Sequence, residues 1–532
     1  MKTATVALRE DYWDTFSLEE TDVEFLYNHL LEVETPLTSE ELLKQLIAER
    51  LRVERERLAH AQRAQDELTY LPKNRYQVGQ RLTFPNLNGQ NGEVLAIRPG
   101  KNPNLPNFEV IRVKLEDGST RELAAGVAEH PLNNPIEIRV DSPALNAEWI
   151  WQEYKGDLLD ILEDGLAENE GFVRIAGRWF PRALLININP AYLHMAEAVL
   201  EMEGGGPIST QGLIEQVNLA TEDNPKLLDF SFDYALQNDP RFDEVGPAGE
   251  VLWYLRRMEP EAVRETPMYL RYEEVEHNRN LLKPNMLKLE QELDDELSPV
   301  NTRVASADEV AIRLIYPHLR GGTLPLSNRV LSIFPTAYEA PRVRFMLIDG
   351  DNDKEFPGWV VRADRYVYGL GKWYQEQGLI PGSIIRIRKG KRPGQVIVQT
   401  GTRRASRDWL RTLMIGSDGG FVFANLRQAV RAEYDERMAI VVPDPEALDE
   451  VWKRIQRNQT PLERTVVTML RELTKDSPQG HVHLSELYAS VNLVRRCPPA
   501  PLMTLLLSRP WFTHIGDLHF RLSDTENNAA HP

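Results

Sequence analysis

The spacing of apolar residues predicts one arrangement twice, in the middle of the chain and at its end. In residues 191–257, three apolar segments at helical spacing precede two apolar stretches that fold back at residues 246–249. In residues 460–522, three more helical segments precede two alternating stretches with a turn at Gly516 and Asp517. Each region therefore predicts three helices followed by a β-hairpin.

The local signals are clearest in the second of these regions. Thr460 can cap a helix while Glu463 reaches back to it, and Pro461 stands where a helix needs no N–H donor. The apolar positions that follow recur at helical spacing and predict a buried face: Val466, Met469, Leu470 and Leu473. Three helices and a hairpin make the winged-helix plan, which usually holds one helix against DNA or a transcription protein.

The first region also resembles the HARE-HTH family, which includes the N-terminal domain of the bacterial RNA polymerase delta subunit. The resemblance rests on a Pro-Ile before the second helix, a phenylalanine and a glycine-rich turn, and an aromatic strand. The matching positions are Pro207, Ile208, Phe242, Val245, Gly246, Trp253 and Leu255. The resemblance implies a winged helix. The acidic tail of delta is absent, so a role in recycling polymerase is not implied.

The N-terminal part of the chain divides by its period. Residues 1–72 predict a helical region with capping boxes that open at Ser17 and Thr38. After Leu51 its apolar positions thin and Arg alternates with Glu, which predicts a solvated helix with ion pairs. A dimerising coiled coil is the alternative. Residues 73–135 change to short strands between glycine turns.

These turn glycines, at Gly79, Gly89 and Gly92, resemble those of the KOW and SH3-like small barrels of transcription and ribosomal proteins. The resemblance implies a small β-barrel, with a packing module as the alternative. Residues 145–260 predict a winged-helix region. It begins with an additional helix and a hairpin about Gly177. Residues 261–300 are polar and predict a helical connector.

Residues 301–400 predict a mixed domain: an apolar helix over 306–319, then strands around one short helix. The pattern resembles the DNA-binding pseudobarrel of plant transcription factors and of some restriction-enzyme recognition domains. Its matching positions are Leu324, Pro325, Leu326, Trp359, Gly369, Leu370, Trp373, Tyr374, Leu379, Pro381, Gly382 and the closing strand 384–388. Ser383 stands where an acid is usual. A barrel used only for packing is the alternative.

The remaining segments complete an α+β multidomain protein. It would combine winged-helix units, a small SH3-like β-barrel and a mixed pseudobarrel. Residues 401–456 predict a small α/β segment of alternating strands and helices, and residues 457–525 a C-terminal winged helix. At 532 residues the chain is long enough for several cores.

The composition of the chain indicates where the protein is located and which partners it has. The formal net charge of −18 argues against a protein coated in positive charge. Cys497 is the single cysteine, so no disulfide can form within the chain. No apolar run approaches the ~20 residues that span a bilayer, and the first residues lack the apolar core of a signal peptide. A cytoplasmic protein without a membrane partner is expected.

A basic cluster nevertheless marks residues 386–411, and arginines bracket the third helix of the last region. Lys and Arg supply sequence-independent affinity for phosphates, so double-stranded DNA is the expected partner, bound along a basic edge of the pseudobarrel. The candidate nucleic-acid-binding residues are Arg386, Arg388, Lys389, Lys391, Arg392, Arg403, Arg404, Arg407, Arg495, Arg496, Arg509 and Arg521. The alternative is a basic face that pairs with acidic surface elsewhere in the chain.

Signals for metal binding and catalysis are weak. Residues 349–355 alternate carboxylates as calcium loops do, but lack the distal glutamate of an EF-hand. Four histidines and the cysteine of the last region could include zinc ligands or be ordinary half-buried side chains: His481, His483, Cys497, His514 and His519. No phosphate-binding, dinucleotide, nucleophile-elbow or metalloprotease motif occurs. We expect no enzyme activity, no cofactor and no metal.

Three functions remain open. The favoured one is a DNA-binding or transcription-associated protein in which winged helices and a basic pseudobarrel surface share the binding. The C-terminal winged helix, with its third helix at residues 498–508, is expected to be the better DNA reader of the two winged helices. The helix at residues 225–238 is acidic and is expected to contact protein instead. The second is an acidic scaffold that binds RNA polymerase or another transcription protein. The third is an accessory subunit of a restriction or defence system.

Overall fold

The computed structural model describes residues 11–84, 87, 90–102, 107–133, 143–219, 224–299, 307–392, 394–416, 419–475 and 477–523, with the backbone alone for 58–68 and 402–406. The chain forms two compact units. Unit 1 comprises Met1–Arg174 and Arg178–Leu185, and unit 2 comprises Ile175–Gly177 and Ile186–Pro532. Among the described residues, no helix is both long and apolar enough to cross a membrane.

Unit 1 contains three helices and a three-stranded sheet in which β1 pairs antiparallel with β7, in the order β1-β7-β6. Its elements are α1 (Glu20–Val33), β1 (Leu37–Thr38), α2 (Ser39–Leu68), α3 (Ala147–Ala167), β6 (Phe172–Ile175) and β7 (Arg178–Pro181). The helix and hairpin expected at 145–188 are confirmed. However, the pairing of β7 with β1 joins them to the N-terminal helices, so the predicted boundary at residue 145 is wrong.

The capping signals of unit 1 are confirmed at one helix and corrected at the other. The Thr38 N–H and hydroxyl both donate to Glu41 Oε2, at 2.8 and 2.9 Å, as the capping box predicts. The first helix is capped by Glu19 and Asp22 rather than by Ser17.

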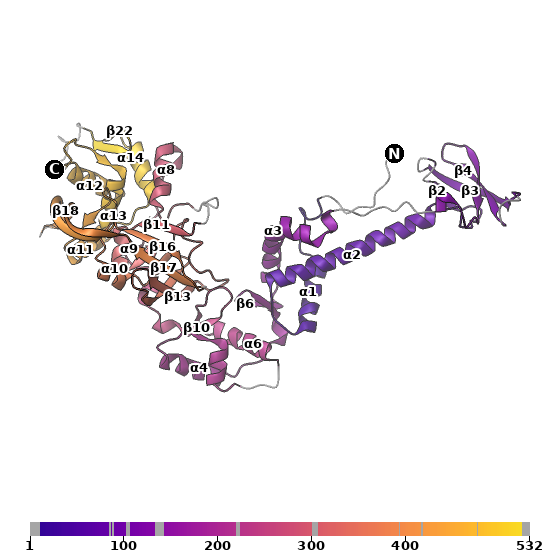
Figure 1. Cartoon of the computed structure of the whole chain (residues 1–532), viewed down its shortest axis with the longest axis horizontal. Coiled ribbons are helices and arrows are strands. Elements are labelled where there is room, and N and C mark those ends of the chain that lie inside the picture. The colour runs from indigo at the N-terminus through magenta and orange to yellow at the C-terminus, as the bar shows by residue number, and fades with distance from the viewer. Residues whose placement is uncertain are drawn as a thin grey trace. The chain divides into compact units, whose positions relative to one another are not determined.

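A four-stranded antiparallel sheet is inserted between α2 and α3, and α2 leads to it (Figure 1). Its strands are β2 (Arg81–Phe84), β3 (Gln90–Pro99), β4 (Glu109–Leu115) and β5 (Thr120–Ala125), paired in that order. Val94, Ile111 and Val113 are fully buried in its core. The short strands predicted for residues 73–135 are confirmed.

Unit 2 contains the three-helix and hairpin plan twice more, in the places where the apolar pattern predicts it. The first consists of α4 (Pro190–Met202), β8 (Ile208–Ser209), α5 (Thr210–Gln216), α6 (Pro225–Gln237), β9 (Phe242–Glu244) and β10 (Leu252–Leu255). The second consists of α12 (Leu462–Lys475), β21 (Val482–His483), α13 (Leu484–Val494), α14 (Pro499–Ser508), β22 (Phe512–Gly516) and β23 (His519–Leu522).

All three copies share one strand order, in which the short strand after the first helix pairs with the last strand of the hairpin. The orders are β1-β7-β6, β8-β10-β9 and β21-β23-β22. We call them the N-terminal, central and C-terminal repeats. α7 (Glu261–Arg264) and α8 (Pro284–Leu293) lie in the predicted connector.

A curled seven-stranded sheet lies between the central and C-terminal repeats in the chain, in the order β11-β16-β17-β13-β14-β15-β12. Its elements are β11 (Glu309–Arg313), α9 (Tyr316–Gly321), β12 (Thr323–Pro325), β13 (Arg342–Asp349), β14 (Glu355–Val361), β15 (Tyr366–Tyr368), α10 (Gly371–Gln377), β16 (Ile384–Lys389) and β17 (Gln395–Thr400). The helix expected over 306–319 is wrong over its middle. There Val310, Ile312 and Leu314 are buried with the period of a strand, and β11 pairs with β16.

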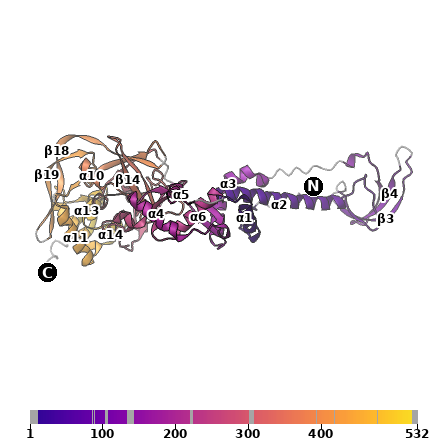
Figure 2. The same ribbon diagram turned by 90° about the horizontal axis from the view of Figure 1, so that it is seen from below.

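The segment after this sheet is a long two-stranded ribbon of β18 (Thr402–Ile415) and β19 (Phe421–Ala432) (Figure 2). β20 (Ile440–Val441) pairs with β18, and α11 (Pro445–Arg457) follows. The alternating strands and helices predicted for residues 401–456 are wrong over Phe421–Ala432, because the chain there is one strand, in unbroken register with β18 from Phe421 to Val430. Leu413 and Phe423 near the turn of this ribbon join the core of the C-terminal repeat.

Candidate nucleic-acid interface

The open end of the β18–β19 ribbon gathers four side chains on one face. Arg407 lies opposite Ala429, and Trp409 lies opposite Arg427. Successive side chains of a strand point to opposite faces, so Arg431, two residues after Ala429, shares this face. We call Arg407, Trp409, Arg427 and Arg431 the ribbon site.

The packing of the ribbon explains why this end is exposed. Toward the turn, the same face carries Leu413 and Phe423, each 2% exposed. The opposite face buries Leu410 and Val430 in a small cluster with Ala439. The ribbon is therefore anchored near its turn and by its opposite face, and Ala432 at its open end joins the core of the seven-stranded sheet. The ribbon site lies between these anchors and is exposed to solvent.

Trp409 is the most unusual member of the site. It is 65% exposed, although a tryptophan is among the largest apolar side chains. The guanidinium carbon of Arg427 lies 5.4 Å from the centre of its ring. A cation over an aromatic face is attracted by the ring quadrupole, so Arg427 holds the indole in a defined orientation.

The arginines of the ribbon site have no acidic partner in the described part of the chain. Arg407, Arg427 and Arg431 are exposed, and none of them forms an ion pair with a described carboxylate. Arg411, two residues after Trp409 on β18, differs from these arginines because it forms an ion pair with Glu486 at 3.2 Å. The ribbon site is therefore a local excess of positive charge on an acidic chain.

The structure separates this site from the other predicted cations of residues 386–392. The sequence predicts that these cations lie along an edge of the pseudobarrel. This is wrong for β16, which lies between β11 and β17 in the sheet. Arg386 pairs with Glu433 at 2.7 Å and Arg392 with Glu355 at 2.9 Å, so the pairing alternative holds for these two arginines.

Three cations near the β16–β17 turn keep no ion pair with a described carboxylate: Arg388, Lys389 and Lys391. They lie at the end of β16 that is opposite to the junction with β18. The side chains of Arg403 and Arg404 lie outside the described residues. Of the cluster predicted from sequence, only Arg407 is described within the ribbon site.

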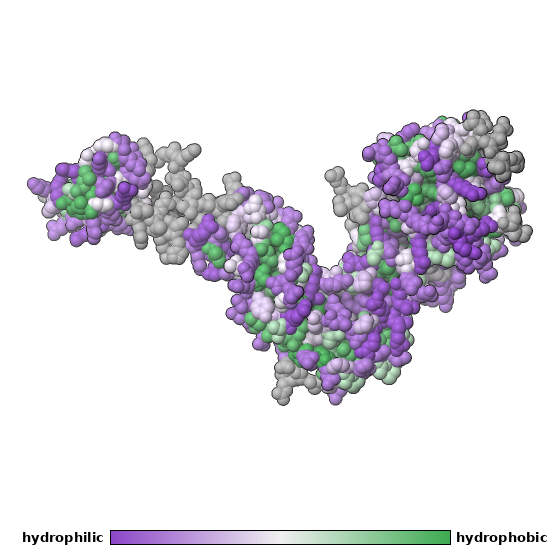
Figure 3. All heavy atoms as spheres, turned by 180° about the vertical axis from the view of Figure 1, so that it is seen from behind, coloured by the Kyte–Doolittle hydropathy of each residue, from purple (hydrophilic) through white to green (hydrophobic). Residues whose placement is uncertain are grey.

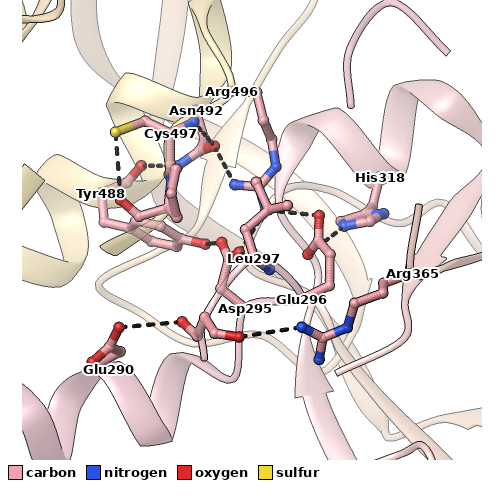
Figure 4. Close-up of polar contacts among 12 residues, drawn as sticks. Glu290, Asp295, Glu296, Leu297, His318, Arg365, Tyr488, Asn492, Arg496 and Cys497 are labelled. Carbon is pink, nitrogen blue, oxygen red and sulfur yellow. Dashed lines mark hydrogen bonds and ion pairs between the residues drawn. The ribbon is translucent and has the colours of Figure 1, made fainter. Parts of the chain in front are cut away.

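Arg496 requires a correction, because its side chain is fully buried rather than at a solvated helix end. Its Nη2 donates to Asp295 Oδ1 at 2.6 Å and to Glu296 Oε1 at 2.7 Å (Figure 4). Burial alone would raise the pKa of Glu296, but the adjacent Arg496 and His318 hold it below its ordinary value. Arg496 is thus neutralised inside unit 2 and cannot reach a phosphate.

The third helix of the C-terminal repeat, predicted at residues 498–508 to contact DNA, is also buried. α14 is buried without interruption from Pro499 to Thr504 and packs against α8. A helix that is apolar on all sides is a core helix. Arg509, at its end, pairs with Glu463 at 3.0 Å, so Glu463 does not close the predicted cap with Thr460. Arg495 donates to the Thr460 carbonyl, and Arg521 is exposed on β23.

The third helices of the other repeats present no basic face either. α6 buries Leu228, Phe232 and Leu236, and its Asp233 accepts from Trp253 Nε1 at 2.9 Å. α3 exposes a row of acids at helical spacing, made of Glu153, Asp157, Asp160 and Asp164. In the part of the chain that the structure describes, the third helices of the repeats therefore carry no group of exposed cations like that of the ribbon site.

The candidate metal residues are placed as follows. The rings of His481 and His519 are 4.7 Å apart and those of His483 and His519 are 5.0 Å apart. Within the described residues, no group of three His, Cys, Asp or Glu side chains is arranged to hold a metal ion. Burial raises the pKa of Cys497 to about 12. In the loop at residues 349–355, Asp349 accepts from the Asp351 N–H at 3.0 Å, which is the geometry of a polar turn.

Sequence reasoning missed three members of the ribbon site, Trp409, Arg427 and Arg431. The alternation of Arg407, Trp409 and Arg411 could have placed the first of them on the basic face of a strand. Comparison of the chain with protein-family models, curated proteins and solved structures finds no match.

Proposed function

We propose that the chain is a DNA-binding protein that holds the phosphate backbone of double-stranded DNA with the ribbon site. One observation carries the proposal: three exposed arginines that form no ion pair with a described carboxylate share a ribbon face with an exposed tryptophan, on a protein with a net charge of −18. An arginine with no internal partner is free to bind an anion at no cost in broken ion pairs.

The shape of the site suits a duplex. The major groove of B-DNA admits a two-stranded β-ribbon, and several DNA-binding proteins insert strands there. The ribbon site occupies the open end of such a ribbon. The acidic remainder of the surface would be repelled by DNA, so the approach would be oriented toward this end.

Other exposed or half-buried cations would add secondary phosphate contacts. They are Arg388, Lys389, Lys391 and Arg521, none of which forms an ion pair with a described carboxylate. We propose in addition that the three repeats are winged-helix units. The shared strand order supports this, and their buried or acidic third helices favour a packing role over base reading.

A second function is favoured by the acidic row on α3. Four exposed carboxylates on one helix face suit a basic protein surface, such as that of RNA polymerase or another transcription protein. The variant E153Q/D157N/D160N should abolish co-purification of such a partner and change DNA affinity by less than about threefold. Retention of the partner by this variant would exclude the acidic row as its binding surface.

The DNA proposal is tested by charge reversal. The triple variant R407E/R427E/R431E should bind duplex DNA at least about tenfold more weakly than the unchanged chain in fluorescence anisotropy. A control with the same change in net charge is K226E/K372E/R464E, whose three positions are exposed and form no ion pair with a described carboxylate. Equal affinity losses in both variants would reduce the effect to overall charge and reject the ribbon site.

A further inference from the structure

Phosphate binding does not explain why Trp409 is exposed. Phosphates are bound by hydrogen-bond donors, and Arg407, Arg427 and Arg431 already supply such donors without the indole. Each of the other tryptophans is buried or half-buried, as Trp253 and Trp452 are at 0% and 1% exposure. A 65% exposed indole, oriented by a guanidinium, is instead a platform for a flat partner.

The neighbours of Trp409 favour a nucleic acid over a protein as that partner. The other exposed apolar side chains of the ribbon, Met414, Val422 and Leu426, lie on the opposite face by strand alternation. Trp409 therefore stands in no apolar patch of the kind that marks a protein interface. Figure 3 shows a mainly hydrophilic surface over the face of unit 2 that it displays.

We propose that Trp409 stacks on an unpaired base of single-stranded nucleic acid, while the flanking arginines hold the phosphates on either side. This inference rests on the proposed function and refines it. Base–aromatic stacking is open to every base and is the usual platform of single-strand binders. Arg407 lies two residues from Trp409 on the same strand, about 7 Å away, and Arg427 lies opposite.

The test uses the full chain with two probes, a labelled oligothymidine and a blunt duplex of the same length. W409A should weaken binding of the oligothymidine by about tenfold and change duplex binding by less than about threefold. W409F, which keeps a ring to stack on, should retain most of the single-strand affinity. M414A removes an exposed apolar side chain from the opposite face of the same ribbon and should change neither affinity.

Failure of the inference is distinguishable from failure of the proposed function. If the unchanged chain binds the duplex but W409A loses neither probe, or loses both equally, stacking is rejected and phosphate binding stands. If the unchanged chain binds neither probe at low salt, both proposals are rejected. Should W409A fail to fold, W409L decides in its place, because it keeps an apolar side chain without a π-face. Equal single-strand affinity of W409L and W409F would overturn stacking.

Discussion

Arg496 Nη2 lies 2.6 Å from Asp295 Oδ1, with both side chains fully buried and 201 residues apart in sequence. The same nitrogen reaches Glu296 at 2.7 Å, and the Asp295 carboxylate also accepts from the hydroxyl of Tyr488. This contact joins the loop after α8 to the end of α13. It makes the C-terminal repeat part of unit 2 rather than a separable reader of DNA.

Removal of Arg496 should therefore destabilise the fold strongly. R496M leaves two carboxylates in the interior without their cation, which costs about 3–5 kcal/mol in the free energy of unfolding. Urea unfolding followed by tryptophan fluorescence measures the loss. The matched control is R509M, which breaks the partly exposed pair with Glu463 and should cost about 1 kcal/mol or less. A loss for R496M no larger than for R509M would show that the buried contact contributes little.

The central repeat should lose stability as pH rises from about 4 to about 7. Burial raises the pKa of Asp233 to about 7, against hydrogen bonds from Thr210 and Trp253 that lower it. The folded state thus keeps a proton that the unfolded chain releases above its ordinary pKa of about 4. The free energy of unfolding therefore falls by about 1 kcal/mol per pH unit in this window.

D233N removes this titration and keeps an oxygen that can accept from Thr210 and Trp253. Its unfolding free energy should lose that part of the pH dependence. D229N, a carboxyl change on the same helix, should retain it. A D233N variant with the pH dependence of the unchanged chain would contradict a protonated Asp233.

The C-terminal repeat should respond in the opposite direction. Burial, together with the charges of Arg437 and His519, lowers the pKa of His483 to about 4. Between pH 6.5 and about 4, His483 is protonated in the unfolded chain and neutral in the folded chain. The free energy of unfolding therefore falls as the pH drops from about 6.5 to about 4. H483N keeps a side chain that can cap α13 and should reduce this acid sensitivity in thermal unfolding. Unreduced acid sensitivity of H483N would assign it to other groups.

The sequence predicts the repeats well because their signals are local. The spacing of apolar residues, the turn glycines and the short alternating stretches between them predict all six helices of the central and C-terminal repeats. The sequence pattern of residues 306–319 predicts a helix where the structure has β11, because the pattern does not include the partner strand β16. Pairing with β16 makes this segment a strand with Val310 and Ile312 facing inward. For the same reason residues 401–456 are predicted as alternating strands and helices, whereas pairing with β18 makes Phe421–Ala432 one strand, β19.

The site is predicted less well, because charge pairing is a long-range property. Asp295 and Glu296, which neutralise Arg496, are about 200 residues away in the chain. Glu433, the partner of Arg386, is 47 residues away. The sequence therefore lists cations without showing which of them remain available. Arg427 and Arg431 enter the site only through the register of β19 with β18.

The most direct test of the ribbon site is the salt dependence of duplex binding by R407A/R427A/R431A. Each phosphate contact contributes about 0.9 to the slope of log affinity against log salt concentration. Loss of three contacts should make the slope shallower by about 2–3 than that of the unchanged chain, while K226A/K372A/R464A keeps the original slope. An unchanged slope in R407A/R427A/R431A would contradict the assignment of the ribbon site to DNA phosphates.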